Sequence, residues 1–408
     1  MKTHKIIYFF YIFIIFILCT CNDPVFYAIS QEIKPIEPRI SGVPTNFAVF
    51  DGRMYIASGN ALLSYRYNKS AGEDYWKRET SPGGNILQIA STGDNLYALC
   101  TTDQNNDGRT TVKRLDKDNS IWLPMGGILN DYAKIQNIFA AGDVLFVWAA
   151  LSTSNYNYNI LFIKNGADAL NIMNNQDDTG IITGAAFNGT SYFLPFTAKK
   201  TDKEKISGVY KIDNINAGAG AKTIIYNEKG NDINVHFNGI INLKDGADTI
   251  LLISRNGDVY TVNASINKIP DVSMGRMSTG ALAIWRENDQ PDCKKLLLAG
   301  RQDSLYYSSS YGYSYGYMEL ELDTVGVKSG AGFAEPGRNP SSSTLLDYER
   351  YQSSLGKYPL NYLFQTPSEI DSKMTLFAST QTNGVWSYRV RDKEQKYWNA
   401  EGEDEPKD

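Results

Sequence analysis

The sequence predicts an all-β fold, a seven-bladed β-propeller with one short helical insertion in the last blade region. Short apolar segments alternate with turns of Gly, Asp or Asn along the chain after residue 43. The turns recur at a nearly regular interval, which indicates stacked copies of one unit. Residues 43–400 number 358. They divide into seven units of about 51 residues, close to the length of a four-stranded blade.

The first 20 residues have the pattern of a signal peptide. Lys2 and Lys5 form a positive segment, and the thirteen residues 6–18 are all apolar or aromatic. Thirteen residues are too few to cross a bilayer as a helix, because a span needs about 20. The sequence therefore predicts export from the cytoplasm.

The end of this leader resembles a bacterial lipobox, in which Cys21 is the acylated thiol. Leu18 stands three residues before Cys21, but Thr20 replaces the usual Gly, Ala or Ser. Cys19 is the competing acceptor with less suitable neighbours, and an ordinary cleaved signal is the alternative. Removal of two lysines leaves a charge of 38 − 45 = −7. Membrane attachment would therefore rest on the acyl chains.

Residues 21–43 have the composition of a tether, since they are polar and rich in proline and lack helical periodicity. The predicted propeller domain follows over residues 44–400. Its seven copies are marked by a turn residue in each, separated by 41, 49, 47, 57, 43 and 82 residues: Gly52, Gly93, Gly142, Gly189, Gly246, Asp289 and Asp371. Closing these copies into a ring would remove the exposed edges of the sheets.

The long last interval contains the predicted helical insertion, over about residues 341–358. Leu345, Tyr348 and Leu355 fall on one helical face, with serines before them and Gly356 and Pro359 after. The sequence leaves open whether this helix caps the central channel or packs on one blade. Residues 401–408 form an acidic tail that we expect to be frayed.

The last unit, residues 377–388, resembles the blade unit of regulator-type and BNR-type propellers. Gly384 would make the tight turn, and Trp386 and Tyr388 would fill the wedge between two blades. With the lipobox and residues 356–359, the whole chain resembles the β-propeller lipoproteins of spirochaetes of the treponemal type. This resemblance implies a propeller in the cell envelope and brings no catalytic residue. The boxes of sialidase propellers are absent from the sequence.

One predicted hairpin tip has the first half of a calcium-binding loop. Asp103, Asn105 and Asp107 occupy ligand positions 1, 3 and 5 and precede a glycine, but Arg114 stands where the bidentate glutamate belongs. Asp, Asn and Gly also occur in such a tip simply because they make turns. The sequence thus predicts no cofactor beyond a weak structural calcium site.

Tyrosines supply the candidate residues for binding a ligand or partner. Four of them would lie on one face of a strand: Tyr311, Tyr313, Tyr315 and Tyr317. Tyr156 and Tyr158 form a smaller pair in another loop. Tyrosine combines a flat apolar face with a hydroxyl group, which suits a sugar ring or a partner protein. The alternative is that these rings merely cover the neighbouring blade.

Composition excludes several classes of function. Without the leader the chain has a single histidine, His236, so a three-histidine zinc site is excluded and any Ser-His-Asp triad would have to use that residue. No basic block suggests a nucleic-acid partner. Cys100 and Cys293 form no CxxC motif, and we expect two buried thiols.

The sequence therefore predicts a lipid-anchored, extracytoplasmic binding scaffold of the bacterial cell envelope, with a protein or a glycan as its partner. No catalytic residue is assigned. The alternative is an enzyme that works with carboxylates alone from the central channel, as in glycosidase-type chemistry.

Overall fold

The computed structural model divides the chain into two compact units, Met1–Glu37 and Pro38–Asp408. All residues that the structure describes belong to the second unit. They are residues 40–68, 73–101, 108–132, 134–150, 158–167, 170–173, 181–199, 205–216, 222–230, 235–243, 249–254, 257–272, 278–287, 290–301, 317–324, 326–334, 360–391 and 395–401.

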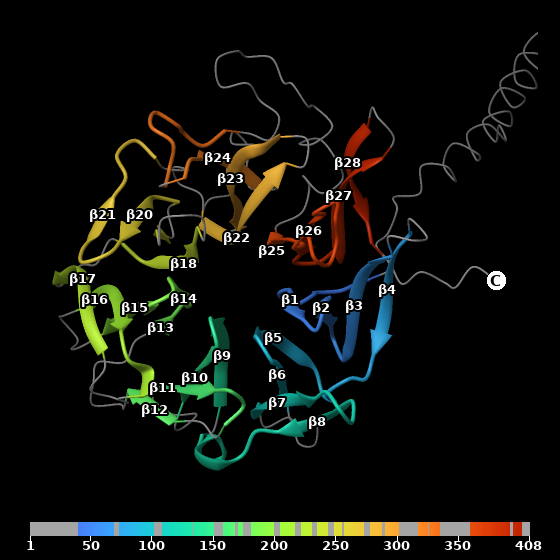
Figure 1. Cartoon of the computed structure of the whole chain (residues 1–408). Coiled ribbons are helices and arrows are strands. Elements are labelled where there is room, and N and C mark those ends of the chain that lie inside the picture. The colour runs from blue at the N-terminus through green and yellow to red at the C-terminus, as the bar shows by residue number, and fades with distance from the viewer. Residues whose placement is uncertain are drawn as a thin grey trace, which may run out of the picture. The chain divides into compact units, whose positions relative to one another are not determined.

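The second unit is a seven-bladed β-propeller, and each blade is an antiparallel sheet of consecutive strands around a common centre (Figure 1). The strands of blades 1 to 3 are β1 (Ala48–Phe50), β2 (Arg53–Ser58), β3 (Ala61–Asn68) and β4 (Glu73–Glu79); β5 (Ile86–Thr92), β6 (Asn95–Thr101), β7 (Thr110–Asp116) and β8 (Ile121–Pro124); and β9 (Lys134–Ala141), β10 (Val144–Ala150), β11 (Tyr158–Lys164) and β12 (Leu170–Met173).

Blades 4 to 7 continue the same order along the chain. Their strands are β13 (Ile181–Ile182), β14 (Ala186–Phe187), β15 (Tyr192–Lys199), β16 (Lys205–Ile212) and β17 (Lys222–Gly230); β18 (Phe237–Asn242), β19 (Ile250–Ser254), β20 (Val259–Val262) and β21 (Ile266–Lys268); β22 (Ser278–Glu287), β23 (Gln290–Arg301) and β24 (Tyr317–Leu322); and β25 (Leu360–Gln365), β26 (Leu376–Thr380), β27 (Val385–Arg391) and β28 (Gln395–Ala400).

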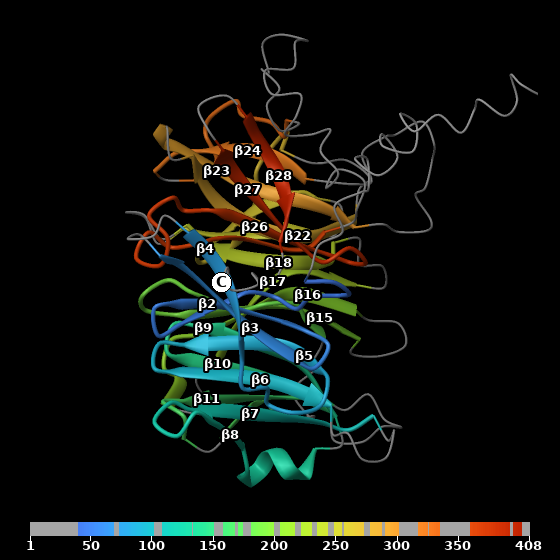
Figure 2. The ribbon, with the colours of Figure 1, turned by 90° about the vertical axis from the view of Figure 1, so that its right-hand side faces the viewer.

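The second strands of blades 3, 5 and 7 are apolar and covered on both faces. Every residue of β10, β19 and β26 is buried, so these strands are continuous buried runs instead of alternating ones. Viewed from the side, the blades stack face to face around the ring (Figure 2). Each of these second strands is packed against a neighbouring blade on each face, so neither face meets water.

The core consists of seven separate apolar clusters, one at each boundary between neighbouring blades. At the boundary of blades 6 and 7, the rings of Trp285 and Tyr388 meet edge to face with centroids 5.8 Å apart. Trp386 is buried in the same cluster, and Gly384 has a φ of +70°. The predicted turn and the predicted wedge residues of the last unit are thus confirmed.

The predicted repeat is confirmed by the seven successive blades, and the five turn markers that the structure describes, Gly52, Gly93, Gly142, Gly189 and Asp371, each lie between the first and second strands of a blade; Gly246 and Asp289 lie outside the described residues. Gly52, Gly93 and Gly142 have φ angles of +68°, +54° and +58°, which favour glycine. The predicted helix over residues 341–358 lies outside the described residues. Within them, the one helical element is the short 3₁₀ turn η1 (Gly127–Asp131).

Two blades depart from the four-stranded pattern. In blade 4 the inner strand is divided into β13 and β14, which both pair with β15. In blade 6 the described residues form three strands, and residues 326–334 run beside the third as an irregular edge with bridges at Val327 and Ala334. These irregular edges still pair with the sheet through backbone hydrogen bonds.

Candidate functional site

Most residues that the sequence selected as candidate sites lie outside the described residues. These are Cys21, Asp103, Asn105, Asp107, Tyr156, Tyr311, Tyr313 and Tyr315. Tyr158 is the first residue of β11, and only its backbone is described. The lipid anchor, the calcium loop and most of the tyrosine ladder therefore remain predictions.

Tyr317 is the one member of the tyrosine ladder whose side chain the structure describes. It begins β24 and is buried, and its ring lies 5.9 Å from that of Trp398 in an edge-to-face arrangement. At this position the ring packs between blades 6 and 7 and is not displayed to a ligand. The alternative role, covering a neighbouring blade, fits Tyr317.

The described residues show no group of three or more His, Cys, Asp or Glu side chains that could hold a metal ion. Among the same residues, no helix has the length and apolar character needed to span a membrane. Cys100 is a buried free thiol, as expected. His236 is partly buried just before β18 and interacts with its surroundings.

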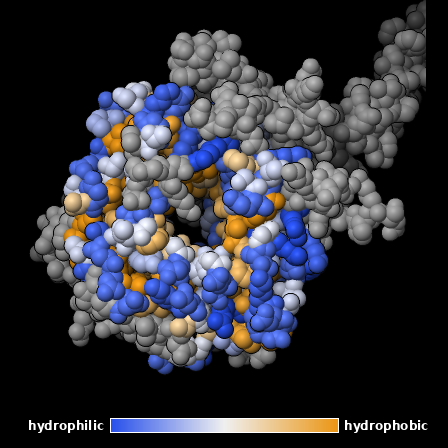
Figure 3. All heavy atoms as spheres, in the orientation of Figure 1, coloured by the Kyte–Doolittle hydropathy of each residue, from blue (hydrophilic) through white to orange (hydrophobic). Residues whose placement is uncertain are grey.

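The first strand of each blade lies innermost, beside the hollow at the centre of the ring (Figures 1 and 3). One edge of this strand pairs with the second strand, and the other has no strand neighbour. Unpaired N–H and C=O groups on such an edge are costly when buried and invite pairing with another chain. The structure satisfies several of these groups with side chains from neighbouring blades.

Amide side chains do this at the first two boundaries. Asn46, just before β1, donates from Nδ2 to the carbonyl of Ile89 (2.5 Å) and accepts from the N–H of Ile89 (3.0 Å). Gln88 of β5 accepts from the N–H of Ile138 (2.8 Å) and donates to Oδ1 of Asn137 (3.0 Å). Asn46, Gln88 and Asn137 each stand five residues before the first residue of their turn, which is Asp51, Gly93 and Gly142 in that order.

Other side chains provide the same connection elsewhere in the ring. Gln365 of β25 accepts from the N–H of Arg286 (2.9 Å) and donates to its carbonyl (2.7 Å), which joins blade 7 to blade 6. Asn242 donates to the carbonyl of Phe187 (2.6 Å) between blades 5 and 4. Thr110 Oγ1 donates to the carbonyl of Ile135 (2.8 Å) and accepts from its N–H (2.7 Å). The inner ring is thus fastened by polar side chains.

The inner strands also bear on the enzymatic alternative. Among their described residues one carboxylate occurs, Glu287 at the end of β22. A glycosidase-type mechanism needs two carboxyl groups that flank one bond. The described part of the channel wall therefore offers no observation that favours this alternative.

Three exposed apolar side chains lie near the starts of inner strands. The structure describes five large apolar residues that are exposed; of these, Ile181 (52% exposed) begins β13, Leu87 (44%) is the second residue of β5, and Val43 (60%) lies five residues before β1. They belong to blades 1, 2 and 4. Because the inner strands of a propeller run in the same direction, these side chains lie at the same mouth of the channel.

A backbone irregularity helps to expose Leu87. The register of β5 with β6 shifts between Ile86 and Gln88, so Leu87 is an extra, bulged residue without a cross-strand partner. A bulge turns its side chain out of the regular alternation. We call Val43, Leu87 and Ile181 the apolar rim.

The other mouth of the channel carries the turns between first and second strands, where carboxylates connect neighbouring blades. Lys117 of blade 2 pairs with Asp51 of blade 1 at 2.6 Å. Tyr192 of blade 4 donates to Asp143 of blade 3 at 2.5 Å, and Lys164 lies 3.4 Å from the same carboxylate.

Each partner in the contact between Tyr192 and Asp143 changes the pKa of the other. Burial would raise the pKa of Asp143, but the hydrogen bond from Tyr192 and the charge of Lys164 bring this pKa below its ordinary value. Burial and the hydrogen bond to Asp143 raise the pKa of Tyr192 well above its ordinary value. The tyrosine therefore stays neutral and keeps donating.

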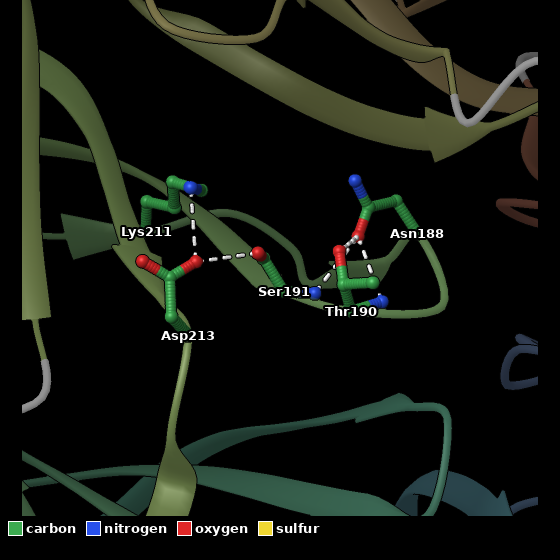
Figure 4. A network of polar contacts seen from close by, with 5 residues as sticks. All are labelled: Asn188, Thr190, Ser191, Lys211 and Asp213. Atoms are coloured by element: carbon green, nitrogen blue, oxygen red, sulfur yellow. Dashed lines mark hydrogen bonds and ion pairs between the residues drawn. The ribbon is translucent and has the colours of Figure 1, made fainter.

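A polar network orders the first turn of blade 4 (Figure 4). Oδ1 of Asn188 accepts from the backbone N–H groups of Thr190 (3.1 Å) and Ser191 (2.8 Å). Ser191 Oγ donates to Asp213 at 2.5 Å, and Lys211 pairs with the same carboxylate at 2.9 Å. The hydrogen bonds from Ser191 and Lys211 lower the pKa of Asp213. Because Ser191 is buried and already donates to a carboxylate, this network is suited to holding the turn.

Blade 6 contains one buried and one partly buried lysine side chain, Lys294 and Lys295. Lys294 donates to the carbonyl of Leu243 at 2.7 Å, which connects blade 6 to blade 5. Burial, and then the charge of Arg286, lower the pKa of Lys294. Lys295 pairs with the buried Glu319 at 2.6 Å and lies over the ring of Trp285. These contacts fasten neighbouring strands and blades.

Comparisons with known proteins identify no family. No protein-family model matches the chain, and no curated protein matches its sequence. Several solved structures resemble the chain in their backbone fold. In a structure described as the crystal structure of a mitotic checkpoint complex, one chain has a TM-score of 0.48 and 11% identity. The likeness covers 88% of this chain and 94% of that one.

Two longer fungal proteins give comparable values. Raptor from Chaetomium thermophilum has a TM-score of 0.46 and 11% identity over 88% of this chain and 30% of its own. Prolyl oligopeptidase B from Galerina marginata has a TM-score of 0.49 and 10% identity over 90% of this chain and 53% of its own. At these scores and identities, the likenesses assign the chain neither to a family nor to a function.

Proposed function

We propose that the chain is a lipid-anchored, extracytoplasmic scaffold of the bacterial cell envelope that binds a partner protein at the mouth of its channel. The single observation that carries the binding site is the apolar rim of Val43, Leu87 and Ile181. Single exposed apolar residues are ordinary on a protein surface. Exposed apolar side chains near the starts of inner strands in three blades, at Val43, Leu87 and Ile181, form a recurring feature that supports a binding role.

The chemistry of the rim favours a protein over a glycan. Valine, leucine and isoleucine offer aliphatic surface, which suits the apolar centre of a protein interface. Sugar rings are better matched by flat aromatic faces, and Tyr317, the described member of the tyrosine ladder, is buried. A glycan partner therefore depends on the tyrosines outside the described residues.

Two features of the sequence support the proposed lipid anchor: the lipobox-like sequence at Cys21 and the proline-rich segment that follows it. Ile40, where the described chain begins, donates its N–H to the carbonyl of Glu401 at 3.0 Å. The first and the last described residues of the propeller, Ile40 and Glu401, are thus hydrogen-bonded neighbours.

The binding role is tested with the full-length protein in membranes of the producing cell. Leu87→Ser combined with Ile181→Ser should abolish recovery of a crosslinked partner. The matched control is Ile121→Ser with Leu123→Ser, which alters two equally exposed apolar side chains on the outer strand β8. Equal loss in both double variants, or retention in the rim variant, would contradict the proposal.

A further inference from the structure

The boundary between blades 7 and 1 differs from the other six in its covalent structure. The blades follow one another along the chain, so at every other boundary a linker joins the last strand of one blade to the first strand of the next, and no linker joins blade 7 back to blade 1. Blade 1 takes all four of its strands from the start of the propeller, and blade 7 takes all four from its end. No strand is shared between them. This boundary, which we call the seam, is therefore closed by noncovalent contacts.

A short segment before the first strand crosses the seam. We call residues 40–42 the strap. The N–H of Ile40 donates to the carbonyl of Glu401 (3.0 Å), and its carbonyl accepts from the N–H of Val385 (3.2 Å). The N–H of Gly384 donates to the carbonyl of Gly42 (3.3 Å). The strap is thus bonded along blade 7, although it continues directly into blade 1.

A buried carboxylate joins the two blades beneath the strap. Glu401, which the sequence assigned to the frayed tail, is buried at the end of blade 7. It accepts a hydrogen bond from Nε1 of Trp76 in blade 1 (2.8 Å) and another from Ser387 in blade 7. A second carboxylate, Asp371 of blade 7, accepts from the hydroxyl of Tyr65 in blade 1 (3.2 Å).

Aromatic packing completes the seam. The ring of Phe377 from blade 7 meets those of Tyr65 and Trp76 from blade 1 edge to face, with centroids 4.9 Å and 5.6 Å apart. Ile40 is buried in the same cluster. The strap, the carboxylates and the rings all act across a boundary that no covalent bond holds.

We propose that the seam is a latch, the boundary at which the ring opens reversibly, and that the strap and Glu401 hold it shut. When blades 7 and 1 separate, the strap loses its hydrogen bonds to blade 7, but every strand stays in its own sheet and no linker between blades is stretched. Opening at any other boundary would leave the two blades connected by the chain. Local opening requires the loss of the contacts at one boundary only, so it costs less than global unfolding.

Hydrogen–deuterium exchange on the full chain, followed by mass spectrometry, tests the latch. In the wild-type protein, amides of the strap and of Gly384 and Val385 should exchange about tenfold or more faster than those of the buried strand β10. Glu401→Ala should accelerate the seam amides by about a further tenfold and leave β10 unchanged. Glu401→Gln should restore the wild-type rate at the seam, because its side-chain oxygen can accept from Trp76 and its amide NH₂ group can donate to Ser387.

Two further variants keep the test decisive. Trp76→Phe removes the indole hydrogen bond but retains an aromatic ring, and it should reproduce Glu401→Ala even if the alanine variant folds poorly. Trp122→Phe is the matched control, because it removes an indole hydrogen bond to Thr80 (2.9 Å) away from the seam. It should leave seam exchange unchanged. Equal exchange at the seam and β10 in the wild type, or uniform acceleration in both seam variants, would overturn the latch.

Discussion

Replacement of Asn46 by alanine should destabilise the propeller far more than the loss of an ordinary surface amide. The side chain of Asn46 holds both backbone groups of Ile89, the donor and the acceptor, on the open edge of the inner strand β5. Alanine removes both hydrogen bonds and offers no replacement. Ile89 is fully buried, so water reaches its backbone poorly.

The magnitude follows from these two bonds. A hydrogen bond contributes about 0.5–1.5 kcal/mol net, and a buried polar group left without a partner costs about 1–3 kcal/mol. Since the channel lies beside the inner strand, some rehydration of the edge is expected. The free energy of unfolding should therefore fall by about 2–4 kcal/mol in Asn46→Ala. Asn119→Ala, which removes an exposed hydrogen bond to Asp116, should cost about 0.5 kcal/mol or less.

Urea unfolding followed by tryptophan fluorescence measures both variants against the wild type. The dependence of the free energy on urea should stay unchanged, because the surface exposed on unfolding is the same. Asn46→Asp keeps the acceptor for the N–H of Ile89 but sets a carboxylate oxygen against its carbonyl, so it should be at least as destabilising as alanine. If Asn46→Ala cost no more than Asn119→Ala, the role of the amides in fastening the inner ring would be refuted.

Three other predictions follow from the turns, a buried cation and the leader. Gly142→Ala should lower the free energy of unfolding, measured in urea, by about 2–3 kcal/mol, because a Cβ there would lie 2.8 Å from the Phe187 ring. Gly52→Ala has open space around it and should cost about 1 kcal/mol of backbone strain. Equal costs in the two variants would contradict the steric reasoning. Because burial lowers the pKa of Lys294, the unfolded chain binds more protons between this pKa and 10.5, and stability should rise with pH there. Urea midpoints from pH 7 to 10 should rise less steeply in Lys294→Met; parallel profiles would contradict the assignment. Cys21→Ala should release the protein from sedimented membranes into the soluble fraction, and unchanged partition would defeat the lipid anchor.

The regular part of the fold could be predicted from the sequence because each blade repeats the same local signals. Turns at Gly52, Gly93 and Gly142 require the positive φ that glycine adopts easily, and apolar strands flank each of them. Trp386 and Tyr388 could be placed at a blade boundary because alternate residues of a strand share a face. These signals are local, so a single sequence contains them.

Features that connect blades were missed, because they join residues far apart in the chain. Asn46, Gln88 and Asn137 carry a signal that could have been found, since each stands five residues before a turn. The sequence contains no such signal for Glu401. Its structural role depends on the hydrogen bond from Trp76, which lies 325 positions earlier in the chain. The exposure of Leu87 depends on a bulge, and an apolar residue in an apolar strand gives no sign of it.

The central claim is that this propeller binds its partner at the apolar rim. Incorporation of a photo-crosslinking phenylalanine analogue at position 87 or 123 of the full-length protein, followed by irradiation of living cells, tests this claim most directly. Both positions carry an exposed leucine, one at the rim and one on the outer strand β8. We expect a discrete adduct from position 87 and none from position 123. Absence of an adduct at 87, or the same adducts from both positions, would contradict it.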